Sequence, residues 1–241
     1  MTFQFRPLLG FTLLFLLLFG LLLGLGFWQL ERLQWKLGLI ADINRNMHAA
    51  PLSIDSALSA GVAASQYRRV ALSGKFINAD EAYVFTTGPH GAAVYHVLTP
   101  LQLRDRRAFM IDRGLVPPAL RDSSTRAAGL FEAERAVVGV LRTPDSPGLF
   151  TPAPDLAHKV WYARDVKGMA TALHLRLSAP VIIEADATPN PGGWPLGGQT
   201  IVDLPNDHLQ YAITWFLLAA ALAIVYLAYH RARGRLAFGA P

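Results

Sequence analysis

Two long hydrophobic segments bracket this chain, and they constrain its fold more than any other feature. The first covers Leu8–Leu30 and the second Tyr211–Tyr229, with 23 and 19 residues and no charged side chain in either. A helix rises about 1.5 Å per residue, so roughly 20 apolar residues cross a bilayer core. The first segment is also longer than the apolar core of a cleaved signal peptide. The sequence therefore predicts two retained transmembrane α-helices flanking a middle segment of globular composition.

The net charge of the chain lies mostly at its two ends. Of the formal charge of +5, four charges come from Arg6, Arg231, Arg233 and Arg235. The nearly neutral middle segment has no basic surface for nucleic acid. Because positive residues favour the cytoplasmic side, we expect both termini in the cytoplasm and the middle segment outside it. Too few residues precede the first span for an organellar transit peptide, so we expect a bacterial inner (plasma) membrane, with the main domain in the periplasm.

The middle segment predicts a helical stalk followed by a mainly antiparallel β domain, barrel- or sandwich-like, with a few helices. Apolar residues recur at three- and four-residue steps from Leu30 to Ile43, and Pro51 ends the helical pattern. Seven runs rich in β-branched and aromatic residues follow: Tyr67–Phe76, Glu81–Thr87, Ala93–Leu101, Arg107–Val116, Ala133–Arg142, Val160–Ala163 and Pro180–Glu184. A helix is expected at Asp165–His174, with Asp165 as its N-cap.

These patterns divide the chain into five expected parts. They are a cytoplasmic tail with the first span (1–30), a stalk (31–50), an extracytoplasmic β-rich domain (51–207), the second span (208–229) and a basic cytoplasmic tail (230–241).

Motifs for catalysis are missing from the sequence. There is no nucleotide-binding glycine loop, no nucleophile elbow, no H-E-x-x-H zinc motif and no cysteine. The segment Asp112–Gly114 lies at a predicted strand end, where its charges could be catalytic but are more typical of a structural ion pair. We therefore predict that the chain is not an enzyme.

Small residues in the spans indicate helix packing. Gly20 and Gly24 have the spacing of a flat helix surface, and Ala219 and Ala223 form a similar pair on the second span. The interpretation is either pairing between the two spans or a site for the helices of a partner.

The best candidate site is the start of the second span. Asn206 or Asp207 can cap the helix, with Gln210 completing a capping box, and His208 would lie in the first turn. The helix dipole would keep this imidazole neutral, which is the form that binds a metal. Aromatic rings at Tyr211 and Trp215 could pack against a flat ligand, so the pattern suits a haem. An interfacial histidine beside an aromatic belt is the alternative interpretation.

Several motifs in the chain resemble one family, and they occur in that family's order. They are Gly26-Phe-Trp-Gln-Leu30-x-Arg32 with Trp35-Lys36, Tyr67-Arg-Arg-Val70 with Gly74-x-Phe76, Leu98-Thr-Pro-Leu101, Asp112-Arg-Gly-Leu-Val-Pro117, Trp161-Tyr-x-Arg-Asp165 and Asn206-Asp-His-Leu-Gln-Tyr-Ala-x-Thr-Trp215. The chain thereby resembles the surfeit locus protein 1 family, assembly factors for haem–copper cytochrome c oxidase. One departure is Leu115, where the family usually has Trp.

The resemblance implies a non-enzymatic chaperone of respiratory-chain biogenesis that binds haem a transiently and aids its insertion into the oxidase. It places the haem iron on His208, with Trp215 nearby, and Tyr211 is the second aromatic contact expected from its position on the helix. Expected partners are the catalytic subunit of the oxidase, haem a synthase and the lipid bilayer. The rival hypothesis is a scaffold that stabilises an oxidase subunit and binds no haem.

Overall fold

The chain forms two compact units. The computed structural model describes residues 3–88, 91–200, 202 and 204–238. One unit contains Met1–Asp42 and Asp203–Pro241, and the other contains Ile43–Val202. The first unit is helical and joins the two ends of the chain, whereas the second is built mainly from strands.

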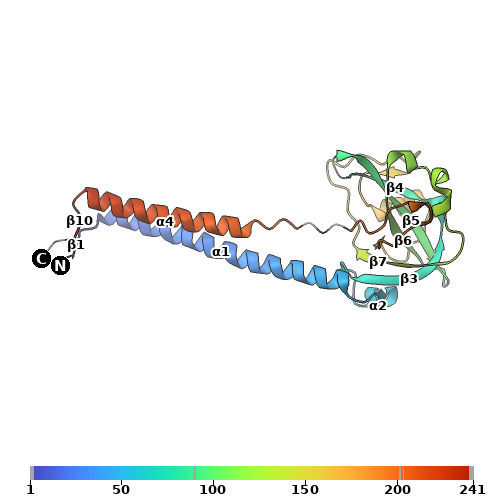
Figure 1. Ribbon diagram of the computed structural model, residues 1–241, viewed down its shortest axis with the longest axis horizontal. Coiled ribbons are helices and arrows are strands. Elements are labelled where there is room, and N and C mark those ends of the chain that lie inside the picture. Colours follow the sequence, from blue (N-terminus) through green and yellow to red (C-terminus); the bar gives the residue numbers. More distant parts are fainter. Residues whose placement is uncertain (1–2, 89–90, 201, 203, 239–241) are drawn as a thin grey trace. The chain divides into compact units, whose positions relative to one another are not determined.

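Two long helices make up the helical unit, α1 (Leu9–His48), whose last residues belong to the other unit, and α4 (His208–Ala232). They lie side by side (Figure 1). Both are long and apolar enough to cross a membrane, and only 6% and 17% of their most apolar stretches are buried. Such exposed apolar surface suits a lipid environment. The prediction of two membrane helices that flank a sheet domain is confirmed, and α1 continues through the predicted stalk without a break.

The termini of the chain are paired by a short sheet that the sequence did not predict. Strand β1 (Phe3–Phe5) runs antiparallel to β10 (Leu236–Phe238). Both strands adjoin a helix of the pair, so this sheet closes one end of the helical unit.

A regular seam joins α1 to α4. On α1 the seam residues recur at alternating steps of three and four: Thr12, Phe15, Phe19, Leu22, Gly26 and Gln29. On α4 the buried positions Ala212, Ala219 and Tyr226 are seven residues apart. This is the spacing of two helices packed at a small crossing angle. The phenolic oxygen of Tyr226 lies 2.7 Å from the hydroxyl oxygen of Thr12, inside the seam.

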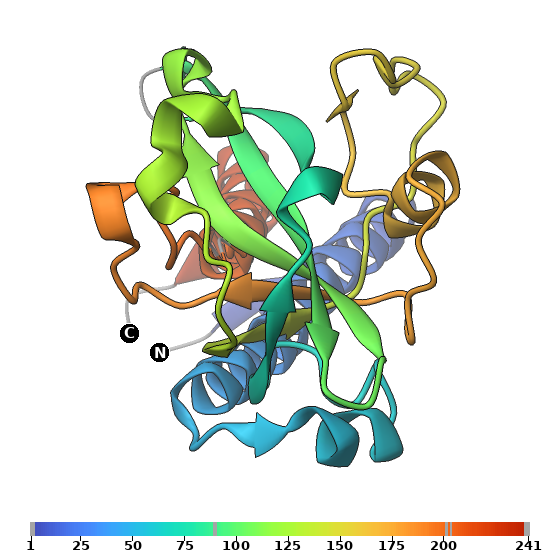
Figure 2. The ribbon, with the colours of Figure 1, turned by 90° about the vertical axis from the view of Figure 1, so that its right-hand side faces the viewer.

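The second unit is a closed β-barrel (Figure 2). Its strands are β2 (Leu52–Ser53), β3 (Arg69–Phe76), β4 (Ala82–Thr87), β5 (Ala93–Leu103), β6 (Ala108–Val116), β7 (Arg135–Arg142), β8 (Val160–Trp161) and β9 (Ile182–Ala185). They follow the order β2-β3-β7-β9-β6-β5-β4-β8, and an additional pairing of β3 with β5 closes the barrel. Most neighbours are antiparallel, but β2–β3, β4–β8 and β6–β9 are parallel.

Short helices complete the barrel unit. They are α2 (Ile54–Ser59), α3 (Val166–Ala172) and the 3-10 turns η1 (Asn78–Asp80), η3 (Pro118–Leu120), η4 (Ser123–Gly129) and η5 (Pro191–Gly193). Asp165 caps α3 as predicted, because its carboxylate accepts a hydrogen bond from the amide of Gly168 at 3.0 Å.

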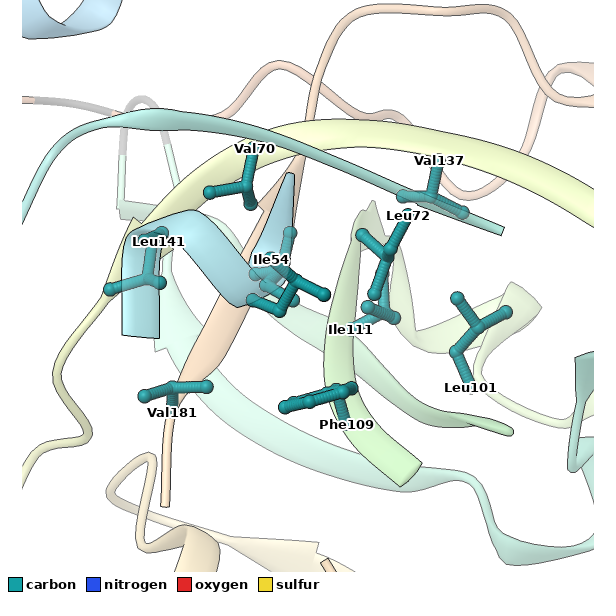
Figure 3. Packing of buried hydrophobic residues seen from close by; sticks show 11 residues of the cluster. Ile54, Val70, Leu72, Leu101, Phe109, Ile111, Val137, Leu141 and Val181 are labelled. Carbon is teal, nitrogen blue, oxygen red and sulfur yellow. The ribbon is translucent and has the colours of Figure 1, made fainter. Parts of the chain in front are cut away.

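The barrel interior holds the main hydrophobic core (Figure 3). Strand β3 alternates buried and exposed residues, as a sheet with one face toward the core requires, whereas β6 and β9 are buried along most of their length. The core side chains labelled there are Ile54, Val70, Leu72, Leu101, Phe109, Ile111, Val137, Leu141 and Val181. Each of the seven runs predicted from sequence corresponds to a strand, so the mainly antiparallel barrel is confirmed.

Candidate functional site

His208 is the first residue of α4 and Asp207 is its N-cap residue, as the sequence predicted, but the predicted capping box is wrong. Asp207 occupies the N-cap position and makes no side-chain capping bond. Asn206 Oδ1 is buried and has no hydrogen-bond partner in the described part of the chain. The start of α4 is therefore fixed by packing against α1 instead of by a capping box.

The His208 imidazole is held by a residue of the other helix. Its Nδ1 lies 2.7 Å from the side-chain oxygen of Gln29, 179 residues away in sequence. Gln29 is only 9% exposed, so α1 positions a buried amide directly against the imidazole. Among the described residues, His208 Nε2 has no hydrogen-bond partner. One ring nitrogen is thus used within the protein and the other remains available.

Gln29 is a site residue that the sequence did not predict, although a signal was present. Gln29 is a polar residue inside an otherwise apolar segment, and such residues usually have a partner because an unsatisfied amide in hydrocarbon is costly. The polarity of Gln29 therefore indicates that it has a partner, but nothing in the sequence indicates that the partner is His208.

The two predicted aromatic residues follow His208 along α4. Tyr211 is 55% exposed, while Trp215 is half-buried. Trp215 is seven residues after His208 and so lies on the same side of the helix. Tyr211 presents an open ring close to the start of α4, where a flat ligand could contact it.

Glycine packing in the helix pair differs from the prediction. Gly20 and Gly24 are exposed, and within the described part of the chain nothing lies within 4 Å of a Cβ atom built on either. Gly26 is the residue that allows close approach, since its Cβ would lie 2.6 Å from the ring of Phe216. The interpretation that Gly20 and Gly24 pair the two spans is therefore wrong. Both remain open toward the surroundings of the helix pair.

His230 occupies the opposite end of α4 and is fully buried. Its Nδ1 donates to the carbonyl of Tyr226 at 3.0 Å, and its Nε2 accepts from the amide of Leu8 at 3.4 Å. The ring also packs against Tyr226, with centroids 4.3 Å apart. Both nitrogens are used, so this histidine joins α1 to α4 and has no nitrogen left for a ligand.

The charges of the Asp112–Gly114 segment are structural. Arg113 is 2% exposed and lies 3.3 Å from the buried carboxylate of Glu81, which also receives Arg126 and the hydroxyl of Thr99. Burial lowers the pKa of Arg113 to about 10, which still leaves it charged at neutral pH. Each charge has an opposite partner within the barrel. This arrangement supports the structural interpretation of the segment.

The barrel contains a cluster of charged side chains around His96. His96 Nδ1 is 2.8 Å from Asp112 Oδ2, an ion pair without the alignment of a good hydrogen bond. Burial lowers the pKa of His96, but Asp112 raises it by more, so the pKa lies above its ordinary value. The cavity beside His96 has a volume of about 310 Å³ and is also lined by Arg142, Arg164 and Glu184. Because these charges pair with one another, the cluster presents no free ligand set.

The fold defines this chain as a β-barrel protein flanked by two candidate membrane-spanning helices. The second helix begins with a histidine that uses one of its two ring nitrogens for a hydrogen bond among the described residues. The model of the SURF1 family matches residues 16–220. The chain belongs to the SURF1 family, the family of oxidase assembly factors that its motifs resemble.

Three relatives illustrate the extent of the similarity. Surfeit locus protein 1 of Takifugu rubripes is 33% identical over 223 residues, which cover 85% of this chain and 90% of the relative. The SURF1-like protein of Monosiga brevicollis is 34% identical over 227 residues, covering 88% and 84%. Human Surfeit locus protein 1 is 30% identical over 222 residues, covering 84% and 72%. The range matched by the family model therefore includes the barrel, most of α1 and the first half of α4.

Proposed function

We propose that this protein is an assembly factor for haem–copper cytochrome c oxidase that holds haem a transiently on His208 and aids its insertion into the catalytic subunit. Membership of the SURF1 family supports the assembly role. The observation that carries the haem proposal is the asymmetry of His208, whose Nδ1 is bound by Gln29 while Nε2 has no described partner. Haem iron in proteins is commonly held by such an imidazole.

The side chains present fit a haem better than a bare metal ion. Among the described residues, no group of three or more His, Cys, Asp or Glu could hold a metal ion. A porphyrin already supplies four nitrogen ligands to its iron, so a single histidine can complete the attachment. The exposed ring of Tyr211 and the half-buried ring of Trp215 supply apolar contact surface. A single protein ligand also suits a carrier that must release its cargo.

The apolar tail of haem a needs a hydrophobic surface next to the histidine. Ala212 and Ala219 on α4 are covered by the helix pair, whereas Gly20 and Gly24 on α1 are open. The tail would therefore follow the outer surface of the helix pair, where the same glycines could admit a helix of the oxidase subunit or of haem a synthase.

The proposed location is the inner membrane of a bacterium, with both termini in the cytoplasm and the barrel in the periplasm. The arginines at the ends of the chain support this orientation. A reporter active only outside the cytoplasm should work when inserted next to Ser123 and fail when fused after the last residue. Activity of the terminal fusion would refute the orientation.

A scaffold that binds no haem is the competing function. The exposed Gly20 and Gly24 favour it, because they provide a helix-docking surface without any need for a cofactor. The scaffold and the carrier differ in one respect that can be measured directly, the presence of haem on the purified protein.

Purification from cells that make haem a tests the proposal. The wild-type protein should carry extractable haem a, and His208→Ala should lose at least nine-tenths of it while remaining folded in the membrane. His48→Ala is the matched control, because His48 is an exposed histidine distant from α4 in sequence. A wild-type protein without haem a, or full retention by His208→Ala, would refute haem binding at this site.

A further inference from the structure

Gln29 is a buried side chain that contacts His208, the residue proposed to bind haem iron. It lies on the face of α1 that packs against α4, one turn after Gly26. Its side-chain oxygen is 2.7 Å from His208 Nδ1, and the residue is 9% exposed. An amide at a membrane boundary is costly to bury without a partner. The placement of Gln29 therefore indicates a specific interaction with His208.

The chemistry of this bond determines which nitrogen of His208 is available. An amide oxygen can only accept a hydrogen bond, so Nδ1 must carry the hydrogen. In a neutral imidazole the other nitrogen, Nε2, then holds the lone pair. Histidines that bind metals usually donate their second ring N–H to an oxygen in this way, which fixes both the tautomer and the ring orientation.

We infer that Gln29 is a positioning residue that holds His208 in the Nδ1–H tautomer and leaves Nε2 as the nitrogen for haem iron. The part of this inference that concerns iron rests on the proposed function, whereas the tautomer does not depend on haem. In this role Gln29 would act on the iron through its hydrogen bond with His208.

The packing around the bond explains how its short distance is maintained. Gly26 brings α1 close to Phe216, and the rings of Phe27 and Phe216 meet edge to face with centroids 5.4 Å apart. Ala212, one turn after His208, is 1% exposed and packs within the same seam. The distance between Gln29 and His208 is therefore set by the spacing of the helices. A change in that spacing would alter the orientation of the imidazole.

Nuclear magnetic resonance of the full chain without haem tests the tautomer. With ¹⁵N-labelled histidine in lipid bicelles, the His208 signals are assigned by their loss in His208→Ala. We expect the Nδ1–H tautomer in the wild type, a shift toward Nε2–H in Gln29→Met, and the wild-type tautomer in Gln29→Glu, which retains an accepting oxygen. Gln34→Met is the matched control, since Gln34 is exposed on the same helix. An Nε2–H tautomer in the wild type, or no change in Gln29→Met, would overturn the inference.

The loaded protein provides a second, separate measurement. Gln29→Met should reduce haem a retention about tenfold, a typical effect of removing the partner of a ligating histidine, and Gln29→Glu should restore it. A wild type that binds no haem yet shows the expected tautomers would refute the proposed function and leave the role of Gln29 intact. Equal haem retention in the wild type and in Gln29→Met would refute the positioning role.

Discussion

The two histidines of helix α4 have opposite environments. His230 is fully buried and both of its ring nitrogens are bound within the protein, to the amide of Leu8 and the carbonyl of Tyr226. His208 uses Nδ1 for Gln29, and its Nε2 has no hydrogen-bond partner among the residues that the structure describes. Residue type and helix are the same, so the difference lies in how many hydrogen bonds the surroundings provide. A histidine with both ring nitrogens hydrogen-bonded stabilises the fold, whereas one with a single hydrogen-bonded nitrogen can hold a ligand on the other.

The largest loss of stability is expected in the barrel, where the buried carboxylate of Glu81 pairs with two arginines. Glu81→Leu leaves Arg113 and Arg126 buried without their carboxylate, which should cost about 3–5 kcal/mol of stability. Chemical unfolding of the full chain in detergent measures this change. Glu134→Ala is the control, because its pair with Arg104 is exposed to solvent and should contribute far less to stability. Equal losses in the two variants would show that burial does not distinguish the pairs.

The next largest effect is the difference in helix-pair stability between variants of the two histidines. His230→Ala leaves the Leu8 amide and the Tyr226 carbonyl without this partner, so the helix pair should lose about 1–3 kcal/mol. The midpoint of unfolding in sodium dodecyl sulfate should therefore fall. His208→Ala should leave that midpoint much closer to the wild-type value. A lower midpoint in His208→Ala than in His230→Ala would contradict the structural role given to His230.

A smaller effect on helix pairing is expected at the glycines of α1, where Gly26 faces Phe216 and Gly20 does not contact α4. Gly26→Leu should push α1 away from Phe216 and weaken helix pairing by about 1–2 kcal/mol. Gly20→Leu should leave the pairing unchanged, because a side chain there meets open space. The same detergent titration measures both variants. If Gly20→Leu instead weakened the pair, the orientation of α1 toward α4 would have to be different.

The smallest effect on stability is expected from His96, whose imidazole pairs with the carboxylate of Asp112 instead of with neutral groups. Its pKa is higher in the folded chain than in the unfolded chain, where it is about 6.5. The stabilisation from the His96–Asp112 pair is therefore complete below that value and is lost as the pH rises through the folded pKa. Unfolding midpoints between pH 6 and 9 should show this loss in the wild type and not in His96→Gln. A wild-type stability that rises over this interval would contradict the sign.

Local patterns were sufficient to predict much of this fold. The uncharged lengths of the two spans predicted both helices, and short β-branched runs predicted β3 to β9 because alternation along a strand is a local property. Closure of the barrel by β3 and β5 was not predicted. That pairing joins residues that are distant in sequence, and neither strand alone indicates its partner.

The site was predicted only in part, for a similar reason. His208 was identified from its place at the start of a span, but Gln29 is 179 residues away and the bond depends on the rotation of α1. The same rotation decides that Gly26, not Gly20 or Gly24, contacts α4. A run of leucines hides this rotation because nearly every position is equally apolar. The buried and exposed faces of α1 therefore become evident only in the structure.

Resonance Raman spectroscopy of the reduced, haem-loaded protein shows whether His208 Nε2 is the protein nitrogen bound to haem iron. An iron–histidine stretching band should be present in the wild type, should shift when histidine is labelled with ¹⁵N, and should be retained in His230→Ala. The band should be absent in His208→Ala. A band that persists unchanged in His208→Ala would place the iron on another residue and contradict the account.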